Sequence, residues 1–142
     1  MIDSLVTSPA IRMLEQTLSF TEQRHQVLAE DIANASTPGF VQRDLSVEEF
    51  QGSLRDAVIR RRRSASNIYA PESGKTITFS GDSNVDAQPT EYPNSVVFHD
   101  RGIRSMEYLM SEMADNAVAH NMTAQLLKGR YDQLSRAISM KV

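Results

Sequence analysis

The chain has 142 residues, enough for one domain with a modest core. Its net charge of -3 disfavours a general nucleic-acid binder, because such a protein needs a basic surface to neutralise phosphates. The absence of cysteine excludes disulfides, thiolate catalysis and zinc–thiolate sites. Aromatic residues make up only 6% of the chain, which favours long helices packed side by side over a compact globule.

The sequence gives no sign of insertion into a membrane. No apolar run approaches the roughly 20 residues that a membrane-spanning helix needs. The first 18 residues also lack the basic start and apolar block of a cleaved signal peptide. The residues alone therefore indicate a cytosolic protein, or one exported by an unusual route.

A long helix is expected within residues 1–36. Ser8 can cap its start and Pro9 is tolerated at the first helical position. Thr37 before Pro38 is pushed out of the helical region, and Pro38-Gly39 favours a turn, so the helix should stop there. Residues with the three–four spacing of a heptad seam lie between these signals: Ile11, Leu14, Leu18, Thr21, His25, Leu28, Ile32 and Ala35.

Residues 37–102 form a middle segment of different character. Ser46 and Glu49 resemble a capping box, in which Glu49 reaches back to the cap, and this predicts a short helix over 46–62. Residues 64–98 are rich in Pro, Gly and small polar side chains, so a flexible loop or small strands are expected there. Alternating runs at 76–79 and 95–98 are the candidate strands.

The C-terminal segment, 103–142, carries the longest heptad pattern. It predicts one long helix whose seam contains a single polar residue, His120. The seam consists of Ile103, Met106, Met110, Met113, Ala117, His120, Ala124, Leu127, Tyr131, Leu134 and Ile138. The methionines Met106, Met110, Met113 and Met122 could suggest a promiscuous groove, but at heptad spacing they favour a packed core.

The expected fold is mainly α, with the two terminal helices forming an antiparallel, coiled-coil-like pair and the middle segment projecting as a side loop. The preferred register places His25 against His120, because burying two polar groups together costs less than burying each against an apolar partner. Registers one heptad away also match the seams. The preferred register pairs Ile11 with Leu134, Leu14 with Tyr131, Leu18 with Leu127, Leu28 with Ala117 and Ile32 with Met113.

Apolar residues also lie outside the seams, on more than one face of the C-terminal helix. Met122 and Leu126 are examples, and Leu5 and Met13 behave similarly near the start of the chain. Two slender helices cannot bury this much apolar surface, so packing against other chains is expected.

One motif resembles that of a known family. Residues 33–40 (ANASTPGF) resemble the ANxxTPGY motif of bacterial flagellar axial proteins, which are rod, hook and hook-associated subunits. Phe40 replaces the usual Tyr, which removes a hydroxyl while leaving its packing possible. The short chain and its 107–116 segment look most like a proximal rod subunit. The motif residues are Ala33, Asn34, Thr37, Pro38, Gly39 and Phe40.

The resemblance implies a structural subunit without cofactor or enzymatic activity. It implies export by the flagellar type III apparatus without a cleaved signal, and assembly in the periplasmic rod of the basal body. Its partners would be other copies of itself, other rod proteins, the adaptor at the base of the rod and the export apparatus. Residues 1–36 and 103–142 would then form the core of the rod.

Other interpretations remain open. Arg60-Arg61-Arg62-Arg63 could contact nucleic acid or an acidic neighbour, but a solvated helix end is the simplest reading, since cations favour a helix C-terminus. The three histidines and the Glu48-Glu49 pair form no recognisable catalytic or metal-binding motif. A different rod subunit, or a cytosolic helical adaptor or secretion chaperone, is the alternative function.

Overall fold

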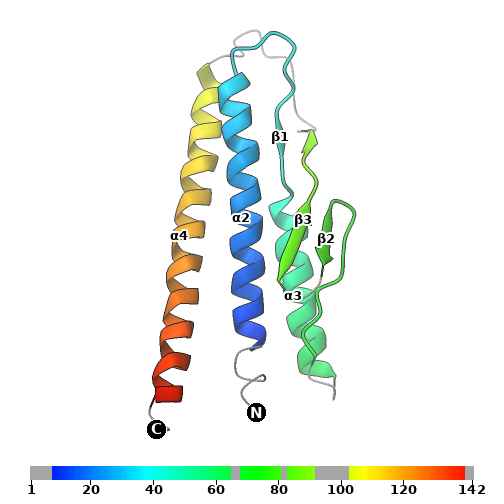
Figure 1. Ribbon diagram of the computed structural model, residues 1–142. Helices are drawn as coiled ribbons and strands as arrows, with labels where there is room; N and C mark the ends of the chain where they lie inside the picture. Colours follow the sequence, from blue (N-terminus) through cyan, green and yellow to red (C-terminus); the bar gives the residue numbers. More distant parts are fainter. Residues whose placement is uncertain (1–7, 65–67, 81–82, 92–102, 140–142) are drawn as a thin grey trace.

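Two long helices and a thin mixed layer make up the molecule. The computed structural model describes residues 8–64, 68–80, 83–91 and 103–139. Helices α2 (Pro9–Asn34) and α4 (Ile103–Ser139) lie side by side and run in opposite directions, as Figure 1 shows. Helix α3 (Val47–Arg63) and the strands lie on the other side of α2. The predicted mainly α fold with paired terminal helices is confirmed.

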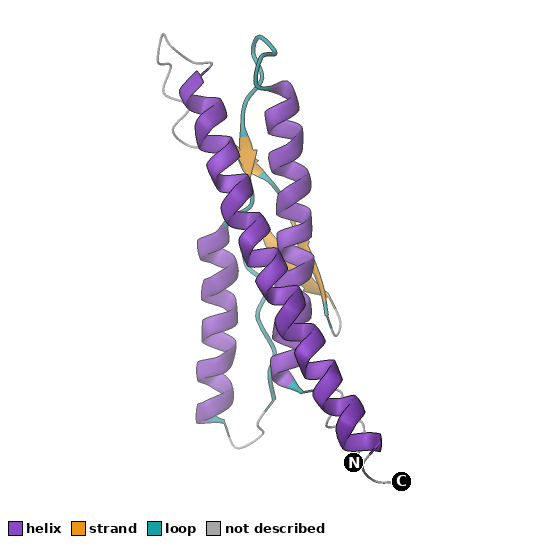
Figure 2. Ribbon diagram, turned by 90° about the vertical axis from the view of Figure 1, so that its left-hand side faces the viewer, coloured by secondary structure: helices purple, strands orange, loops and turns teal. Residues whose placement is uncertain are grey.

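The side view in Figure 2 shows that α4 crosses α2 obliquely. The start of α2 is formed by Ser8, whose carbonyl oxygen accepts hydrogen bonds from Ile11 and Arg12, while its side chain makes no cap hydrogen bond. No helix among the described residues is long and apolar enough to cross a membrane.

The cap of α3 differs in one respect from the predicted capping box. The Ser46 hydroxyl accepts a hydrogen bond from the Glu49 backbone N–H at 3.2 Å, as expected. The Glu49 carboxylate does not reach back to Ser46, and instead accepts from the backbone N–H and hydroxyl of Thr76 at 3.0 and 2.7 Å. Gly74 makes this possible, because a Cβ there would collide with the Glu49 carboxylate. Glu49 thus ties α3 to the segment before the hairpin.

Two small antiparallel pairs of strands lie in the middle segment. Strands β2 (Ile77–Ser80) and β3 (Asn84–Ala87) form a hairpin, with Ile77 opposite Ala87. Strands β1 (Arg43–Asp44) and β4 (Thr90–Glu91) form the second pair. The run at 76–79 is close to β2, whereas the run at 95–98 lies outside the described residues.

The hydrophobic core lies between α2, α3 and the hairpin. The rings of Phe20 and Phe50 stack with centroids 4.2 Å apart, and Phe79 stacks on Phe50 at 6.2 Å. The expectation that the whole middle segment projects as a side loop is therefore wrong, because α2 has a second apolar face that this segment covers. The buried cluster contains Phe20, Leu45, Phe50, Leu54, Ala57, Tyr69, Ile77, Val85 and Ala87.

One buried tyrosine anchors the loop that follows α3 to the first helix. The Tyr69 hydroxyl donates to Gln16 Oε1 at 3.0 Å, and both side chains are buried. Burial raises the pKa of Tyr69 to about 12, so the hydroxyl keeps its proton and remains a donor. The loop after α3 is thereby held against α2.

Candidate assembly interface

The ANASTPGF motif forms the exit from α2. Helix α2 ends at Asn34, whose side-chain amide donates to the Glu30 carbonyl at 2.8 Å. The Asn34 carbonyl in turn accepts from the Thr37 N–H at 2.8 Å, and Phe40 N–H closes a turn onto Thr37 at 3.2 Å. Gly39 has a φ of 79°, the left-handed conformation that glycine adopts without strain. Ala33, in the last turn of α2, and Pro38, in the turn that follows, are exposed.

The strand that follows the motif is fixed to α2 by two acids. Asp31, which is fully buried, accepts from the Arg43 backbone N–H at 2.7 Å. Its pKa is raised, because burial disfavours the charged carboxylate. Asp44 receives two hydrogen bonds from Arg24, at 2.9 and 2.6 Å. The direction in which the chain leaves α2 is therefore set by polar contacts on both residues of β1.

Arg24 also reaches the C-terminal helix. Its guanidinium donates to Glu112 Oε2 at 2.6 Å, so one side chain joins α2, β1 and α4. Burial alone would lower the pKa of Arg24, but the hydrogen bonds that it donates to both carboxylates, and their negative charge, outweigh this and raise it. We call Arg24, Asp44 and Glu112 the ionic hub. The heptad patterns of the sequence give no indication of these residues.

The predicted seam of α2 is placed partly as expected. Leu28 is fully buried against the interior of the molecule, and Ile11 is almost so. His25 is exposed, and Arg24 takes the buried position beside it. Thr21 is buried. The remaining seam residues are half-buried: Leu14, Leu18, Ile32 and Ala35.

The seam of α4 is rotated by one residue from the prediction. The buried positions are Leu109, Asn116 and Thr123, each one residue before the predicted Met110, Ala117 and Ala124. Met113, His120, Leu127 and Leu134 are half-buried, as are Met106, Ala117 and Ala124. The prediction that Met110, Tyr131 and Ile138 are covered by the first helix is wrong: their exposed fractions are 55%, 42% and 54%.

The register is close to the prediction at one end and shifted in the middle. Tyr131 donates to Glu15 Oε1 at 2.5 Å, one residue from its predicted partner Leu14. In the middle, His120 Nδ1 lies 3.0 Å from Thr21 Oγ1, and the Asn116 amide donates to the Thr21 carbonyl at 2.9 Å. The predicted contact between His25 and His120 is therefore wrong by one helical turn. Asn116, which is outside the predicted seam, makes the contact more polar than expected.

The outer side of α4 carries an apolar stripe that no other part of the described structure covers. It consists of Val118, Met122 and Leu126, which recur every four residues and are therefore neighbours on the helix surface. Their exposed fractions are 67%, 64% and 55%. Gly129 continues the stripe, and a Cβ there would meet nothing. We call these three apolar residues the outer stripe.

The arginine run ends α3. All four arginines lie in the last turn, where cations interact favourably with the helix dipole. Arg60 is paired with Glu72, while Arg62 and Arg63 are exposed. Within the described residues, no group of three His, Asp or Glu side chains could hold a metal ion.

Comparisons with known proteins found relatives among flagellar basal body rod proteins. No family model matches the chain. The flagellar basal body rod protein FlgB of Escherichia coli (strain K12) is 28% identical over 138 residues, which cover 92% of this chain and 91% of that protein. FlgB of Salmonella typhimurium (strain LT2) is 26% identical, with 89% of each chain covered.

FlgB of Yersinia ruckeri is 25% identical over 92% of both chains. These similarities extend over nearly the full length, so they include both terminal helices, the motif at the end of α2 and the middle layer. Together with the paired terminal helices and the ANASTPGF turn, they support the assignment of this chain as a FlgB flagellar rod protein.

Proposed function

We propose that this chain is a structural subunit of the proximal rod of the flagellar basal body, and that it polymerises through its terminal helices. The observation that carries this proposal is the outer stripe on α4. Val118, Met122 and Leu126 each expose more than half of their surface on a long helix, and apolar patches of this kind are typical of protein contacts.

The partners of the proposed subunit are other copies of itself, other rod proteins and the adaptor at the base of the rod. The flagellar type III apparatus would export the chain without removing a signal peptide, and the subunit would act in the periplasmic part of the basal body. Its role is structural and needs no cofactor. The predicted seam residues of both terminal helices, together with the outer stripe, would supply the contacts.

The axial-family motif has a mechanical part in this proposal. Asn34, Thr37 and Gly39 hold the turn at the end of α2 in one conformation through the hydrogen bonds described above. In a helical assembly every subunit repeats the same contacts, so a fixed exit direction is repeated around the rod. The middle layer is then presented at the same angle in each subunit.

The test is a charge placed on the outer stripe. Met122→Asp should abolish incorporation into basal bodies and stop swimming, because a carboxylate buried between helices loses its solvation. The adjacent exposed residue supplies the control, Asn121→Asp, which should leave both unchanged. Circular dichroism melting should be the same for both variants, because neither residue is buried in the subunit.

Two outcomes would contradict the proposal. Normal motility of Met122→Asp would show that the outer stripe is not an assembly contact. Absence of the wild-type chain from purified basal bodies, with recovery as a discrete cytosolic oligomer, would instead support a helical adaptor or chaperone.

A further inference from the structure

The methionines of the chain differ in how far solvent reaches them. Five of the seven lie among the described residues: Met13, Met106, Met110, Met113 and Met122. Met13 packs against the core cluster, and Met106 and Met113 are half-buried on α4. Met110 and Met122 have exposed fractions of 55% and 64%. A dissolved oxidant should therefore reach the sulfur atoms of these two residues first, because it must touch the sulfur to react with it.

Met122 occupies the middle of the outer stripe. Val118 lies one turn before it and Leu126 one turn after it, and both are exposed. Between residues 116 and 127, α4 contains no Lys, Arg, Asp or Glu, and its one histidine, His120, lies beside Thr21 of α2. A contact made by this part of α4 therefore depends on burial of apolar surface, and a polar group added to the stripe would have no charged neighbour on the helix.

Met110 provides a comparison on the same helix. It is nearly as exposed as Met122, but it is outside the outer stripe. The exposed acid Glu107 precedes it by three residues, which places the two side chains next to each other on the helix surface. An added polar group at Met110 would therefore lie on a surface that is already polar, whereas at Met122 it would interrupt an apolar one.

The chemistry available to an exposed methionine is transfer of one oxygen atom. The lone pair of the thioether sulfur attacks one oxygen of hydrogen peroxide, and the O–O bond breaks as the S–O bond forms. The proton of the transferred hydroxyl passes to the departing hydroxide, which leaves as water. The sulfur loses two electrons and the peroxide gains them. The product is a polar, chiral sulfoxide, which methionine sulfoxide reductases convert back to methionine.

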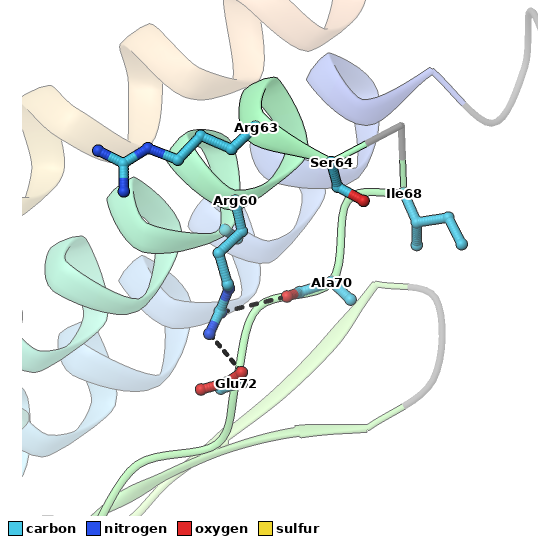
Figure 3. A pocket seen from close by; sticks show the side chains of 7 residues that line it. Arg60, Arg63, Ser64, Ile68, Ala70 and Glu72 are labelled. Atoms are coloured by element: carbon cyan, nitrogen blue, oxygen red, sulfur yellow. Dashed lines mark hydrogen bonds and ion pairs between the residues drawn. The ribbon is translucent and has the colours of Figure 1, made fainter. Parts of the chain in front are cut away.

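A second exposed apolar residue lies in a groove that this chemistry would not change. Figure 3 shows Ile68 beside the arginine run, where Arg60 is paired with Glu72 and donates to the Ala70 carbonyl at 3.5 Å. Ile68 is 65% exposed, as accessible as Met122. None of the described residues that line this groove contains sulfur. A peroxide would therefore alter the outer stripe and leave the groove as it is.

We propose that Met122 is a site of reversible oxidation by peroxides, and that its sulfoxide prevents the subunit from joining the rod. This rests on the proposed rod function and adds a modification to the outer stripe. A sulfoxide oxygen buried between helices loses its hydrogen bonds to water, which weakens association by about tenfold or more. The stripe is covered once the subunit is assembled, so the reaction acts on subunits that have not yet been incorporated.

The first experiment maps the reaction on the purified full chain. Hydrogen peroxide is added, and peptide mass spectrometry follows each methionine with time. The sulfoxide should form about fivefold faster at Met122 than at Met106 or Met113, because the latter two are half-buried. The circular dichroism melt should not change, and methionine sulfoxide reductases should restore the original mass. Equal rates at the three positions would overturn the assignment of Met122 as the reactive site.

The second experiment tests the effect on assembly. Cells that are building flagella receive a sublethal pulse of hydrogen peroxide, and the chain is quantified in purified basal bodies. Incorporation of the wild type should fall about tenfold. Met122→Leu should be incorporated normally with and without peroxide, because leucine keeps a similar apolar volume and has no sulfur. The matched control is Met110→Leu, which should remain as sensitive as the wild type.

The outcomes separate this proposal from the rod function. Equal losses of wild type and Met122→Leu, or no loss of wild type, would overturn the role of the sulfoxide while leaving the rod function intact. Peroxide added to purified basal bodies should oxidise Met122 much more slowly than in the free chain, and an equal rate would show that the stripe is not covered. Absence of the untreated wild type from basal bodies would instead contradict the rod function itself.

Discussion

The side chain of Arg24 connects three elements of the fold, α2, β1 and α4. Its guanidinium is mostly buried and satisfies two carboxylates that belong to β1 and α4. A buried charge network of this kind adds little when compared with a well-packed apolar core, but the loss of one member leaves the others uncompensated. The hub is therefore more important for holding elements in place than for net stability.

Arg24→Ala should lower the free energy of unfolding by about 3 kcal/mol, because Asp44 and Glu112 would remain together without their cation. Arg24→Lys should be intermediate, since an ammonium group keeps the charge but cannot bind both carboxylates in the same planar geometry. Urea denaturation followed by circular dichroism measures both. An unfolding free energy of Arg24→Ala equal to that of the wild type would show that the hub is dispensable.

Gly39 is the second position where a single residue decides local structure. Its φ of 79° strains any side chain with a Cβ, although open space surrounds it. Gly39→Ala should therefore cost about 1 kcal/mol of stability through backbone strain alone. Gly52 provides the comparison, because its φ is not in this region and it lies in α3; Gly52→Ala should stabilise the helix. Thermal melts of the two variants should shift in opposite directions.

At the scale of elements, the attachment of α3 to the hairpin depends on Glu49. Hydrogen bonds from Thr76 lower the pKa of the Glu49 carboxyl below its ordinary value of 4.5. A lowered pKa in the folded state contributes stability that is present above the unfolded pKa and is lost as pH falls through the folded one.

Glu49→Gln should therefore make the free energy of unfolding depend less on pH in the acidic range. Below about pH 4, the wild type should lose the contribution of Glu49, and the two proteins should converge. Urea midpoints measured between pH 3 and pH 7 test this.

Gly74→Ala should act through the same contact, because its methyl group displaces the Glu49 carboxylate. The double variant should then be no less stable than the worse single variant, and additive losses would contradict this coupling.

The sequence predicts where the two long helices lie, but it predicts less well which of their residues are buried in the contact between them. Proline, glycine and heptad spacing located α2 and α4, but the heptad reading assumed that apolar residues are the buried ones. In α2 the buried row keeps Thr21 and Leu28 of the predicted seam, but it contains Arg24 and Asp31 in place of His25 and Ile32. Only partners distant in sequence, such as Asp44 for Arg24, make a polar row suitable for burial. Periodicity carries no information about them.

The heptad pattern also does not predict that the middle segment packs against α2. Phe20 belongs to α2 but lies off its predicted seam, and its partners Phe50 and Phe79 come from two other elements. A single helical stripe was assigned to α2, while the helix is in fact covered on two sides. The predicted roles of the seam and motif residues in assembly stay predictions.

At the scale of the whole molecule, folding and assembly use different surfaces. The buried cluster contains no residue of α4, whose last described turns are exposed apart from the half-buried Leu134. Removal of residues 132–142 should therefore leave a cooperative thermal transition, with a small decrease in melting temperature. It should nevertheless prevent rod assembly, because the proposed contacts of the terminal helix are lost. Basal bodies purified from the truncated strain test this, and normal swimming would contradict it.

The polar character of the contact between α2 and α4 has a consequence for how the subunit comes apart. Hydrogen bonds through Asn116 and Thr21, and the ion pair of Arg24 with Glu112, can be exchanged for water one by one. Separation of α4 would expose Leu109 and Leu28 to water, whereas the cluster around Phe20, to which neither residue belongs, would keep its contacts. We therefore expect α4 to separate from α2 under tension before the cluster around Phe20 unfolds. The helix can then pack back onto α2 without refolding of that cluster.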